Sequence, residues 1–154
     1  MFTHNTAFEN AFHFSRFDRQ SPFSTVLDSP FLLDDVHWLT AEHYYQANKF
    51  KGLEYAKTIM HAVDGEQAYQ LGNRWLKRKN SHWKQYRTLY MTRALYRRVM
   101  EYVDVKEALL ATQEQLMIET SSYDYFWGIG RDQRGENALG KVWMDIRHKL
   151  MATE

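Results

Sequence analysis

The sequence predicts a mainly α-helical α+β fold, built as a single compact helical domain with a few short strands. The chain has 154 residues, which is typical of one domain and is long enough to bury roughly 70% of its unfolded surface. It has only two prolines, and strand-like segments do not alternate with helical ones as they do in a doubly wound sheet. After residue 42 most segments carry helical periodicity or helix-capping residues, so we expect helices to dominate.

The first forty residues contain most of the predicted strands. Residues 1–11 show poor periodicity, and we expect them to form a flexible leader before a domain that spans residues 12–154. Residues 13–15 and 31–38 have the composition of short strands. The second of these segments contains Asp34 and Asp35, where we expect the chain to turn back as a hairpin.

The most informative segment lies between Thr40 and Gly52, which are a good N-cap and a good stop for a helix. Within it, Glu42, Gln46 and Lys49 are spaced i, i+4, i+7 and therefore share one helix face. A carboxylate, an amide and an amine aligned among large aromatic residues suit a pocket for a polar, planar substrate. The alternative is a solvated stripe of polar side chains beside a separate core face.

Further helices are expected along the rest of the chain. Asp64 and Asp104 are candidate N-caps, and Gly72 is a candidate helix stop. Residues 115–120 resemble a strand, and the glycine-containing stretch 121–137 predicts a loop. The expected helices comprise residues 54–63, 64–71, 81 to about 102, 105–111 and 139–151.

The composition excludes several classes of protein and site. The chain has no cysteine, which excludes disulfides, thiolate catalysis and thiolate metal sites. Its seven histidines show no spacing typical of a metal site, so no metal is expected. The start of the chain lacks the basic and apolar regions of a signal peptide, and no apolar stretch approaches the length of a membrane span. We therefore expect a soluble cytoplasmic protein with no membrane partner.

The net charge of +1 conceals a strongly basic block. Residues 73–100 contain no Asp or Glu, but they contain nine Lys and Arg residues. Such a block is either a solvated helix face or a surface that attracts phosphate, because charge of one sign raises the local concentration of anionic ligands.

A second informative stretch contains two carboxylates, Glu119 and Asp124, followed by Trp127 and the glycines Gly128 and Gly130. Glycine lets the backbone approach a ligand closely, and the amides that open the next helix favour an anion. Gly-x-Gly spacing is weak evidence by itself, and a tryptophan such as Trp127 more often anchors the core than serves as a stacking platform. The serine-hydrolase elbow and the phosphate-binding P-loop patterns are both absent.

Several separated blocks of the sequence then combine into one pattern. They are Phe23-Ser24, Pro30, Asp34, Trp38, Glu42-His43-Tyr44, Gln46-Ala47, Lys49-Phe50, Trp83, Arg93-Ala94-Leu95, Leu109-Leu110-Ala111-Thr112, Glu119, Asp124, Trp127-Gly128, Gly130, Gly135, Asn137 and Leu139-Gly140. In order and spacing, these blocks resemble the NADAR, or YbiA-like, N-glycosidase family over roughly residues 13 to 150. The chain departs from the pattern at Ser24-Thr25-Val26, where many members have Ser-Asn-Phe, a change that can alter substrate preference.

The resemblance implies a YbiA-like fold and an enzyme that hydrolyses N-glycosidic bonds without a metal or another cofactor. The implied substrates are phosphoribosylated intermediates of riboflavin synthesis, or ADP-ribose carried on guanine, including ADP-ribosylated nucleic acid. The choice between these two classes stays open, as does the oligomeric state. A non-catalytic module that binds ADP-ribose or nucleotides is the alternative function.

Breaking a ribose–nitrogen bond builds positive charge on the anomeric carbon, while the leaving nitrogen needs a proton. We expect Glu42 and Asp124 to be the principal pair of acids, with Glu119 as a substitute for either. Lys49 is either a nucleophile that forms a Schiff base with the opened sugar or a fixed positive charge. The expected substrate-binding residues are Trp38, Gln46, Trp83, Arg93, Trp127, Gly128, Gly130 and Asn137.

Overall fold

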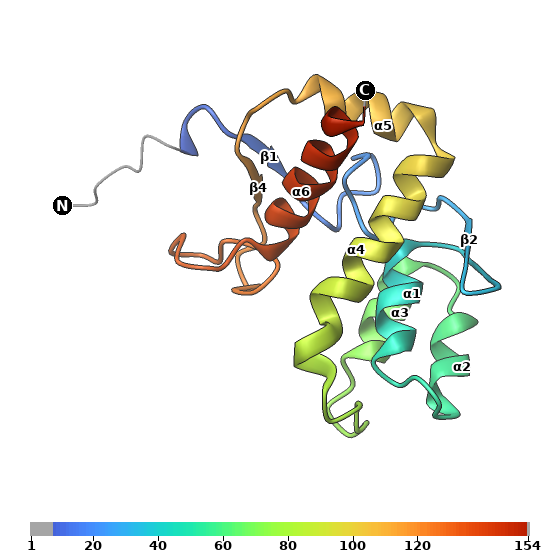
Figure 1. Cartoon of the computed structure of the whole chain (residues 1–154). Coiled ribbons are helices and arrows are strands. Elements are labelled where there is room, and N and C mark those ends of the chain that lie inside the picture. Colours follow the sequence, from blue (N-terminus) through green and yellow to red (C-terminus); the bar gives the residue numbers. More distant parts are fainter. Residues whose placement is uncertain (1–7, 154) are drawn as a thin grey trace.

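The computed structural model describes residues 8–153 and confirms a mainly helical α+β domain with a few short strands (Figure 1). The predicted leader, residues 1–11, lies mostly outside the described residues and stays a prediction. No helix within residues 8–153 has the length and apolarity needed to cross a membrane. In chain order the elements are β1 (Phe12–Phe14), β2 (Phe31–Leu33), β3 (Val36–Trp38), α1 (Ala41–Asn48), α2 (Tyr55–Met60), α3 (Gly65–Gly72), α4 (Trp83–Glu101), α5 (Val103–Ala111), β4 (Met117–Glu119) and α6 (Ala138–Ala152).

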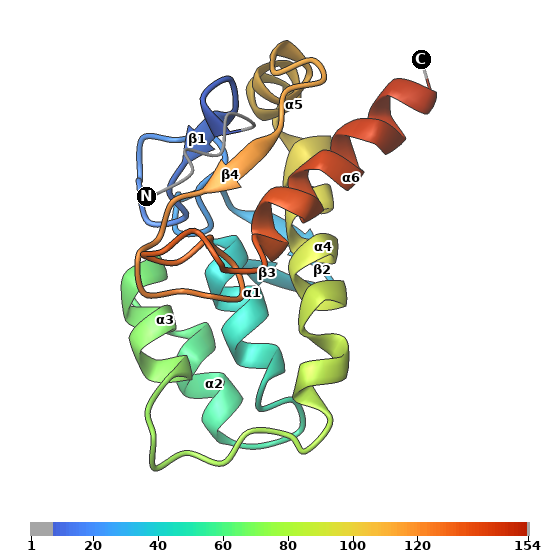
Figure 2. The same ribbon diagram turned by 90° about the vertical axis from the view of Figure 1, so that its left-hand side faces the viewer.

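The elements divide between two halves that α4 connects (Figure 1 and Figure 2). One half contains the pair of β1 and β4 together with α5 and α6, and the other contains α1, α2 and α3. Helix α1 packs against α2, α3 and α4, whereas α6 packs against α4 and β4. The segment after β1 and the loop after β4 therefore meet α1 where the two halves join.

Two strand pairs position these segments. Strand β1 pairs in parallel with β4, with Phe14 opposite Glu119, so residues just after β1 lie beside the start of the loop that follows β4. Strands β2 and β3 form the predicted antiparallel hairpin. Its turn residues Asp34 and Asp35 have φ angles of 54° and 61°, in the left-handed region that Asp tolerates in tight turns.

Helix α1 is buried along its whole length. The three polar residues of its predicted face are among the most enclosed: Glu42 is 0%, Gln46 1% and Lys49, just after the helix, 6% exposed. The alternative of a solvated stripe is therefore wrong. Thr40 caps the helix as predicted, because its Oγ1 accepts a hydrogen bond of 3.1 Å from the backbone N–H of His43.

The other helix ends are partly as predicted. Asp64 caps α3 by accepting a hydrogen bond of 2.8 Å from the N–H of Gln67. The prediction that Asp104 caps α5 is wrong, because the helix begins at Val103 and its N-cap is Tyr102. Tyr102 is a single extended residue between α4 and α5, so the second helix follows the first with no room for a longer connection.

The contact between α6 and β4 gives a test of the fold. The Cβ of an alanine at Gly140 would lie 2.2 Å from the backbone oxygen of Met117. Gly140→Ala would ordinarily favour a helix interior, but here it must push α6 away from β4. We expect it to lower the free energy of unfolding by about 1–3 kcal/mol, as overpacking does, measured by urea denaturation.

Lys141→Ala is the matched control, because Lys141 is the next residue of α6 and is exposed. Its expected effect is within about 0.5 kcal/mol. Equal stability of Gly140→Ala and the parent chain would contradict the described contact between α6 and β4.

Candidate active site

A polar cavity of about 180 Å³ opens where the two halves of the molecule join. Helices α1, α3 and α4 contribute to its wall, together with the loop after β4 and the segment after β1. The lining combines cationic, carboxylate, amide and aromatic side chains. Its residues are Arg16, Tyr45, Gln46, Lys49, Tyr69, Asn73, Lys79, Trp83, Arg87, Asp124, Phe126 and Trp127.

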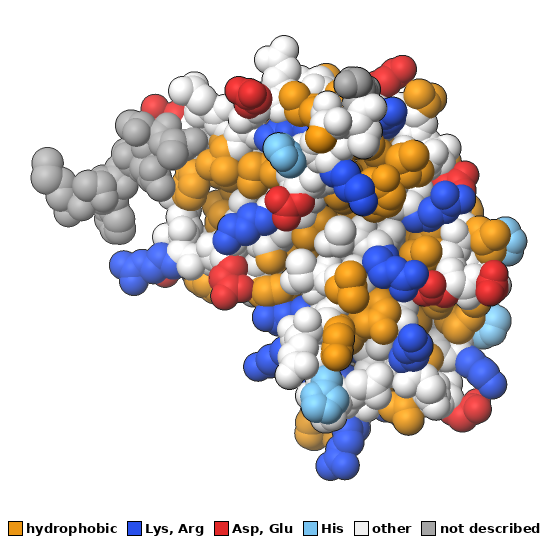
Figure 3. Space-filling view, viewed as in Figure 1, with side chains coloured by type: hydrophobic (Ala, Val, Ile, Leu, Met, Phe, Trp, Pro, Cys, Tyr) orange, Lys and Arg blue, Asp and Glu red, His pale blue; other side chains and the backbone are white. Residues whose placement is uncertain are grey.

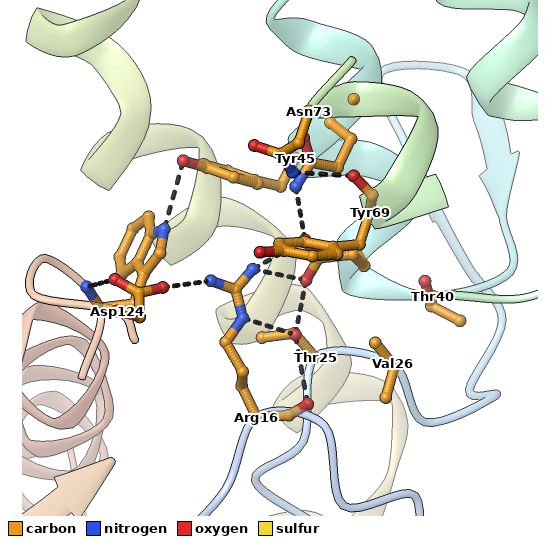
Figure 4. A network of polar contacts seen from close by, with 12 residues as sticks. Arg16, Thr25, Val26, Thr40, Tyr45, Tyr69, Asn73 and Asp124 are labelled. Carbon is orange, nitrogen blue, oxygen red and sulfur yellow. Dashed lines mark hydrogen bonds and ion pairs between the residues drawn. The ribbon is translucent and has the colours of Figure 1, made fainter. Parts of the chain in front are cut away.

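A buried ion pair between Arg16 and Glu42 forms the base of this site (Figure 4). The Arg16 Nη2 donates to both carboxylate oxygens of Glu42, at 2.7 and 2.8 Å. Two further donors complete the shell of Glu42: the Thr25 hydroxyl at 2.6 Å and the Gln46 side-chain amide at 2.6 Å. Each carboxylate oxygen of Glu42 thus accepts two hydrogen bonds from protein groups.

The environment keeps both members of the pair ionised. Burial alone would raise the pKa of Glu42, but the charge and hydrogen bonds of Arg16 hold it below its ordinary value. Burial alone would likewise lower the pKa of Arg16, but Glu42 and Asp124 raise it above its ordinary value. An ionised and enclosed Glu42 has no proton to give and does not line the cavity.

Asp124 is the carboxylate that faces the cavity. Its Oδ2 accepts a hydrogen bond of 3.2 Å from Arg16 Nη1, as Figure 4 shows. Its Oδ1 accepts from the backbone N–H groups of Phe126 and Trp127, at 3.0 and 2.8 Å. The side chain is 24% exposed, so a ligand can reach a carboxylate that Arg16 and two amides hold in place.

Lys49 brings an amine to the same cavity. Its Nζ donates to the backbone oxygen of Gly72 at 3.3 Å and to Oδ1 of Asn73 at 3.2 Å. Burial lowers the pKa of Lys49 to about 8, although the charge of Glu42 opposes this shift. At pH 7 about a tenth of the amine is therefore unprotonated, which is the form in which a lysine acts as a nucleophile.

Aromatic rings supply the remaining wall. The Tyr45 ring lies 5.1 Å from that of Trp83 and 5.3 Å from that of Trp127, and Trp127 Nε1 donates to the Tyr45 hydroxyl at 3.3 Å. Burial raises the pKa of Tyr45 to about 12, so its phenol stays neutral. The guanidinium of Arg87 lies 3.2 Å from the centre of the Phe126 ring. These flat, polar-edged surfaces suit a planar ligand.

The structure brings together Glu42, Gln46, Lys49, Trp83, Asp124 and Trp127 around or beneath this cavity. Two other predicted residues, Trp38 and Arg93, line a separate cavity of about 540 Å³. There Arg93 is held by Asp34 at 2.6 and 3.0 Å and by the Tyr44 hydroxyl at 2.7 Å. Arg93 therefore does not reach a phosphate in the polar cavity.

The remaining predicted residues support the loop around Asp124. Glu119 is fully buried, and its Oε1 accepts from the N–H of Arg16 at 3.0 Å. A Cβ on Gly128 would lie 2.2 Å from Glu119 Oε2, and Gly130 has a φ of 72°. Asn137 ties the loop to β4, because its Oδ1 accepts from the N–H of Glu119 at 2.9 Å.

Sequence reasoning missed several lining residues, which are Arg16, Tyr45, Tyr69, Asn73, Lys79, Arg87 and Phe126. Lys79 and Arg87 belong to the basic block, which the sequence did indicate as a phosphate-attracting surface. Arg16 has no such signal, because it lies in a segment without periodicity. No group of His, Asp and Glu within residues 8–153 is arranged to hold a metal ion.

Comparison with known proteins gives a family and a fold. The NADAR domain model matches residues 1–151. N-glycosidase Npun_R5314 of Nostoc punctiforme is 36% identical over 121 residues, which cover 77% of this chain and 78% of that protein. The NMR structure of Escherichia coli YbiA matches with a TM-score of 0.82 and 28% identity, covering 94% of this chain and 87% of that chain. This likeness confirms the YbiA-like fold.

Two further matches carry names that describe activity or pathway. N-glycosidase YbiA of Escherichia coli (strain K12) is 29% identical over 137 residues, or 89% of this chain and 86% of that protein. Riboflavin biosynthesis protein VVA0006 of Vibrio vulnificus is 32% identical over 113 residues. These cover 73% of this chain but only 31% of that longer protein.

The buried pair predicts a strong coupling between Arg16 and Glu42. Either Arg16→Gln or Glu42→Gln alone leaves an unpaired buried charge, so each should cost about 3–5 kcal/mol of unfolding free energy. The double variant should cost clearly less than the sum of the two, measured by urea denaturation at pH 7. Additive losses would contradict the ion pair.

The same variants predict a pH dependence. Because folding lowers the pKa of Glu42, its contribution is fully present above the unfolded value of about 4.3 and is lost as pH falls further. Below about pH 4 the parent should lose stability more steeply than Glu42→Gln. Glu54→Gln, which removes an exposed carboxylate, should follow the parent.

Proposed function

We propose that this chain, which belongs to the NADAR domain family, hydrolyses the ribose–nitrogen bond of a phosphoribosylated or ADP-ribosylated base. Relatives that match most of its length are named N-glycosidases, so the chain is a hydrolase acting on N-glycosyl compounds. One observation carries the finer proposal: a reachable carboxylate, Asp124, and a desolvated amine, Lys49, line the same aromatic cavity.

Asp124 is suited to stabilise the transition state. As the bond to the base breaks, positive charge builds on the anomeric carbon, and an ionised carboxylate beside it lowers the energy of that state. Its fixed hydrogen bonds to two backbone amides and Arg16 reduce the reorganisation needed during reaction. A nucleophile then adds to the anomeric carbon, and the departing nitrogen takes up a proton.

Glu42 has a positioning role in this mechanism. It is fully enclosed, ionised and bonded to Arg16, which in turn holds Asp124. The pair of acids expected from the sequence thus becomes one working carboxylate, Asp124, and one supporting carboxylate, Glu42. Gln46 also lines the cavity, and its side-chain amide holds Glu42 in place by donating to Oε1 at 2.6 Å.

Lys49 is suited to a covalent route. Its unprotonated amine attacks the anomeric carbon and displaces the base, whose nitrogen takes up a proton. The ribose ring then opens as its ring oxygen is protonated, leaving a Schiff base between the sugar and Lys49. Water adds to the Schiff base, releases the free sugar and restores the amine.

The cations of the wall suit a phosphorylated substrate. Lys79 and Arg87 both line the cavity, and Arg87 Nε is buried without a hydrogen-bond partner. A phosphate on the ribose would pair with these side chains through charge-assisted hydrogen bonds. Both proposed substrate classes carry such a phosphate.

Asp124→Asn tests the activity. Parent and variant are incubated with a phosphoribosylated amine and, separately, with ADP-ribosylated guanosine, and the free base is quantified by chromatography. The parent should release the base from at least one substrate, and the variant should be slower by about 10²–10⁴-fold. Asp132→Asn, in the same loop but exposed, should keep the parental rate.

If the parent binds both compounds but releases no base or sugar, it is a reader of nucleotides and not an N-glycosidase. If it releases the base and Asp124→Asn is equally fast, the assigned role of Asp124 is wrong.

The role of Lys49 is tested by pH and by trapping. Since the pKa of Lys49 is about 8, the nucleophilic fraction grows as pH rises. The single-turnover rate should therefore increase about tenfold per pH unit below 8 and level off above it. Sodium borohydride added during turnover should fix the sugar to Lys49, detected by peptide mass spectrometry.

Lys49→Arg keeps the positive charge but removes the nucleophile, so it should abolish both turnover and trapping. Lys51→Arg, at the exposed position two residues on, is the control. Parental turnover by Lys49→Arg without any trapped adduct in the parent would assign Lys49 to charge balance alone.

A further inference from the structure

The loop that leads from α3 to α4 has an unusual surface. Residues 74–79, which we call the basic loop, are all exposed. Trp75 is 89% and Leu76 75% exposed, although tryptophan is normally well buried. The other four residues are Arg74, Lys77, Arg78 and Lys79. A bare indole ring among four cations is a combination that folding of this domain does not require.

The cations of the basic loop have no acidic partners. None of the four forms an ion pair with any described residue, and residues 73–100 contain no Asp or Glu. At the lower end of the molecule in Figure 3, Lys and Arg side chains lie beside hydrophobic ones. This charge is therefore available to an anionic partner.

The basic loop is fastened to the candidate active site at both ends. Before it, Asn73 Oδ1 accepts from Lys49 Nζ at 3.2 Å. After it, the N–H of Asn80 donates to the backbone oxygen of Lys49 at 2.8 Å. Its last residue, Lys79, lines the polar cavity itself. The basic loop therefore borders the polar cavity at Lys79.

A second aromatic cavity adjoins the first. It measures about 320 Å³ and shares Trp83 with the polar cavity. Its wall includes the stacked rings of Trp83 and Tyr90, with 5.6 Å between centroids, and the exposed ring of Tyr86. Asn80, the residue that follows the basic loop, also lines this second cavity. Aromatic side chains are thus present outside the polar cavity as well, in a second cavity that begins at the residue after the basic loop.

We propose that the basic loop binds a single-stranded polynucleotide whose modified base occupies the polar cavity. This inference rests on the proposed function and names the part of the substrate that lies outside the reacting site. Arg74, Lys77 and Arg78 contact backbone phosphates, and Trp75 stacks on a base that flanks the modified nucleotide. Exposed rings and cations along a path are the features that bind single strands, because every unpaired base offers a face for stacking.

A single strand fits better than a duplex or a membrane. In a duplex the bases are already stacked and cannot reach Trp75. The net charge is only +1, so attraction is confined to this local surface and not spread over a long duplex. A membrane would cover the basic loop and the adjoining mouth of the cavity, which must admit the substrate.

Binding of a fluorescein-labelled, unmodified single-stranded oligodeoxynucleotide to the full chain tests the inference, measured by anisotropy over a series of salt concentrations. Arg74→Ser combined with Arg78→Ser removes two cations, so the slope of log K against log salt should fall by about 1.4. Trp75→Ala should weaken binding by about 5- to 100-fold, and Trp75→Phe should retain most of the affinity. A duplex of the same sequence should bind more weakly.

Lys141→Ser combined with Lys149→Ser is the control, because it removes two cations from exposed positions of α6. It should leave both affinity and slope unchanged. Hydrolysis of a mononucleoside substrate should be the same in all these variants, while hydrolysis of a modified oligonucleotide should fall with the loop variants only.

Parental oligonucleotide binding in the loop variants would overturn the inference and leave the proposed hydrolysis intact. So would loop-dependent capture of phosphatidylserine vesicles without oligonucleotide binding. If oligonucleotide binding depends on the loop but neither substrate is hydrolysed, the inference stands and the proposed function fails.

Discussion

The ion pair between Arg16 and Glu42 is the constraint on which the site depends. One guanidinium connects three segments that are far apart in sequence: the turn after β1, helix α1 and the loop after β4. A buried pair of this kind adds little net stability, since desolvation of two charges offsets most of their attraction. Its larger effect is on geometry, because Arg16 contacts Glu42 through Nη2 and Asp124 through Nη1 at the same time. The two halves of the molecule are thus held in one relative position by charge as well as by packing.

This arrangement divides the charged groups by function. Glu42 neutralises the buried positive charge of Arg16. Asp124 contacts Arg16 with one oxygen and stays partly open to solvent. Burial favours the neutral form of the Lys49 amine, and so do the nearby positive charges of Lys79, Arg16 and Arg87. In the proposed function, the reachable carboxylate of Asp124 is the stabiliser and the partly neutral amine of Lys49 is the nucleophile. In water the amine would instead be almost fully protonated near neutral pH.

The parts of this site that follow local rules were predictable from the sequence. The polar face of α1, the caps at Thr40 and Asp64 and the hairpin turn at Asp34 all depend on neighbours within a few residues. Arg16 was not predictable, because its partners are 26 and 108 positions away and the residues around it have no period. Arg93 shows the converse: its sequence context suggested phosphate binding, but the hairpin places Asp34 within reach and the two pair.

The departure from the family pattern at Thr25 and Val26 is related to the same ion pair. Thr25 is fully buried, and its hydroxyl donates to Glu42 at 2.6 Å, while Arg16 Nε donates to that hydroxyl at 3.4 Å. Val26 packs so closely on α3 that a Cβ on Gly65 would lie 2.7 Å from its Cα. In this chain, therefore, these two positions support the base of the cavity and do not present groups to its interior. An amide and an aromatic ring at the same positions would need either a different packing of α3 or a different partner for Glu42. In the proposed function, recognition of the reacting part of the substrate therefore depends on the other residues that line the cavity.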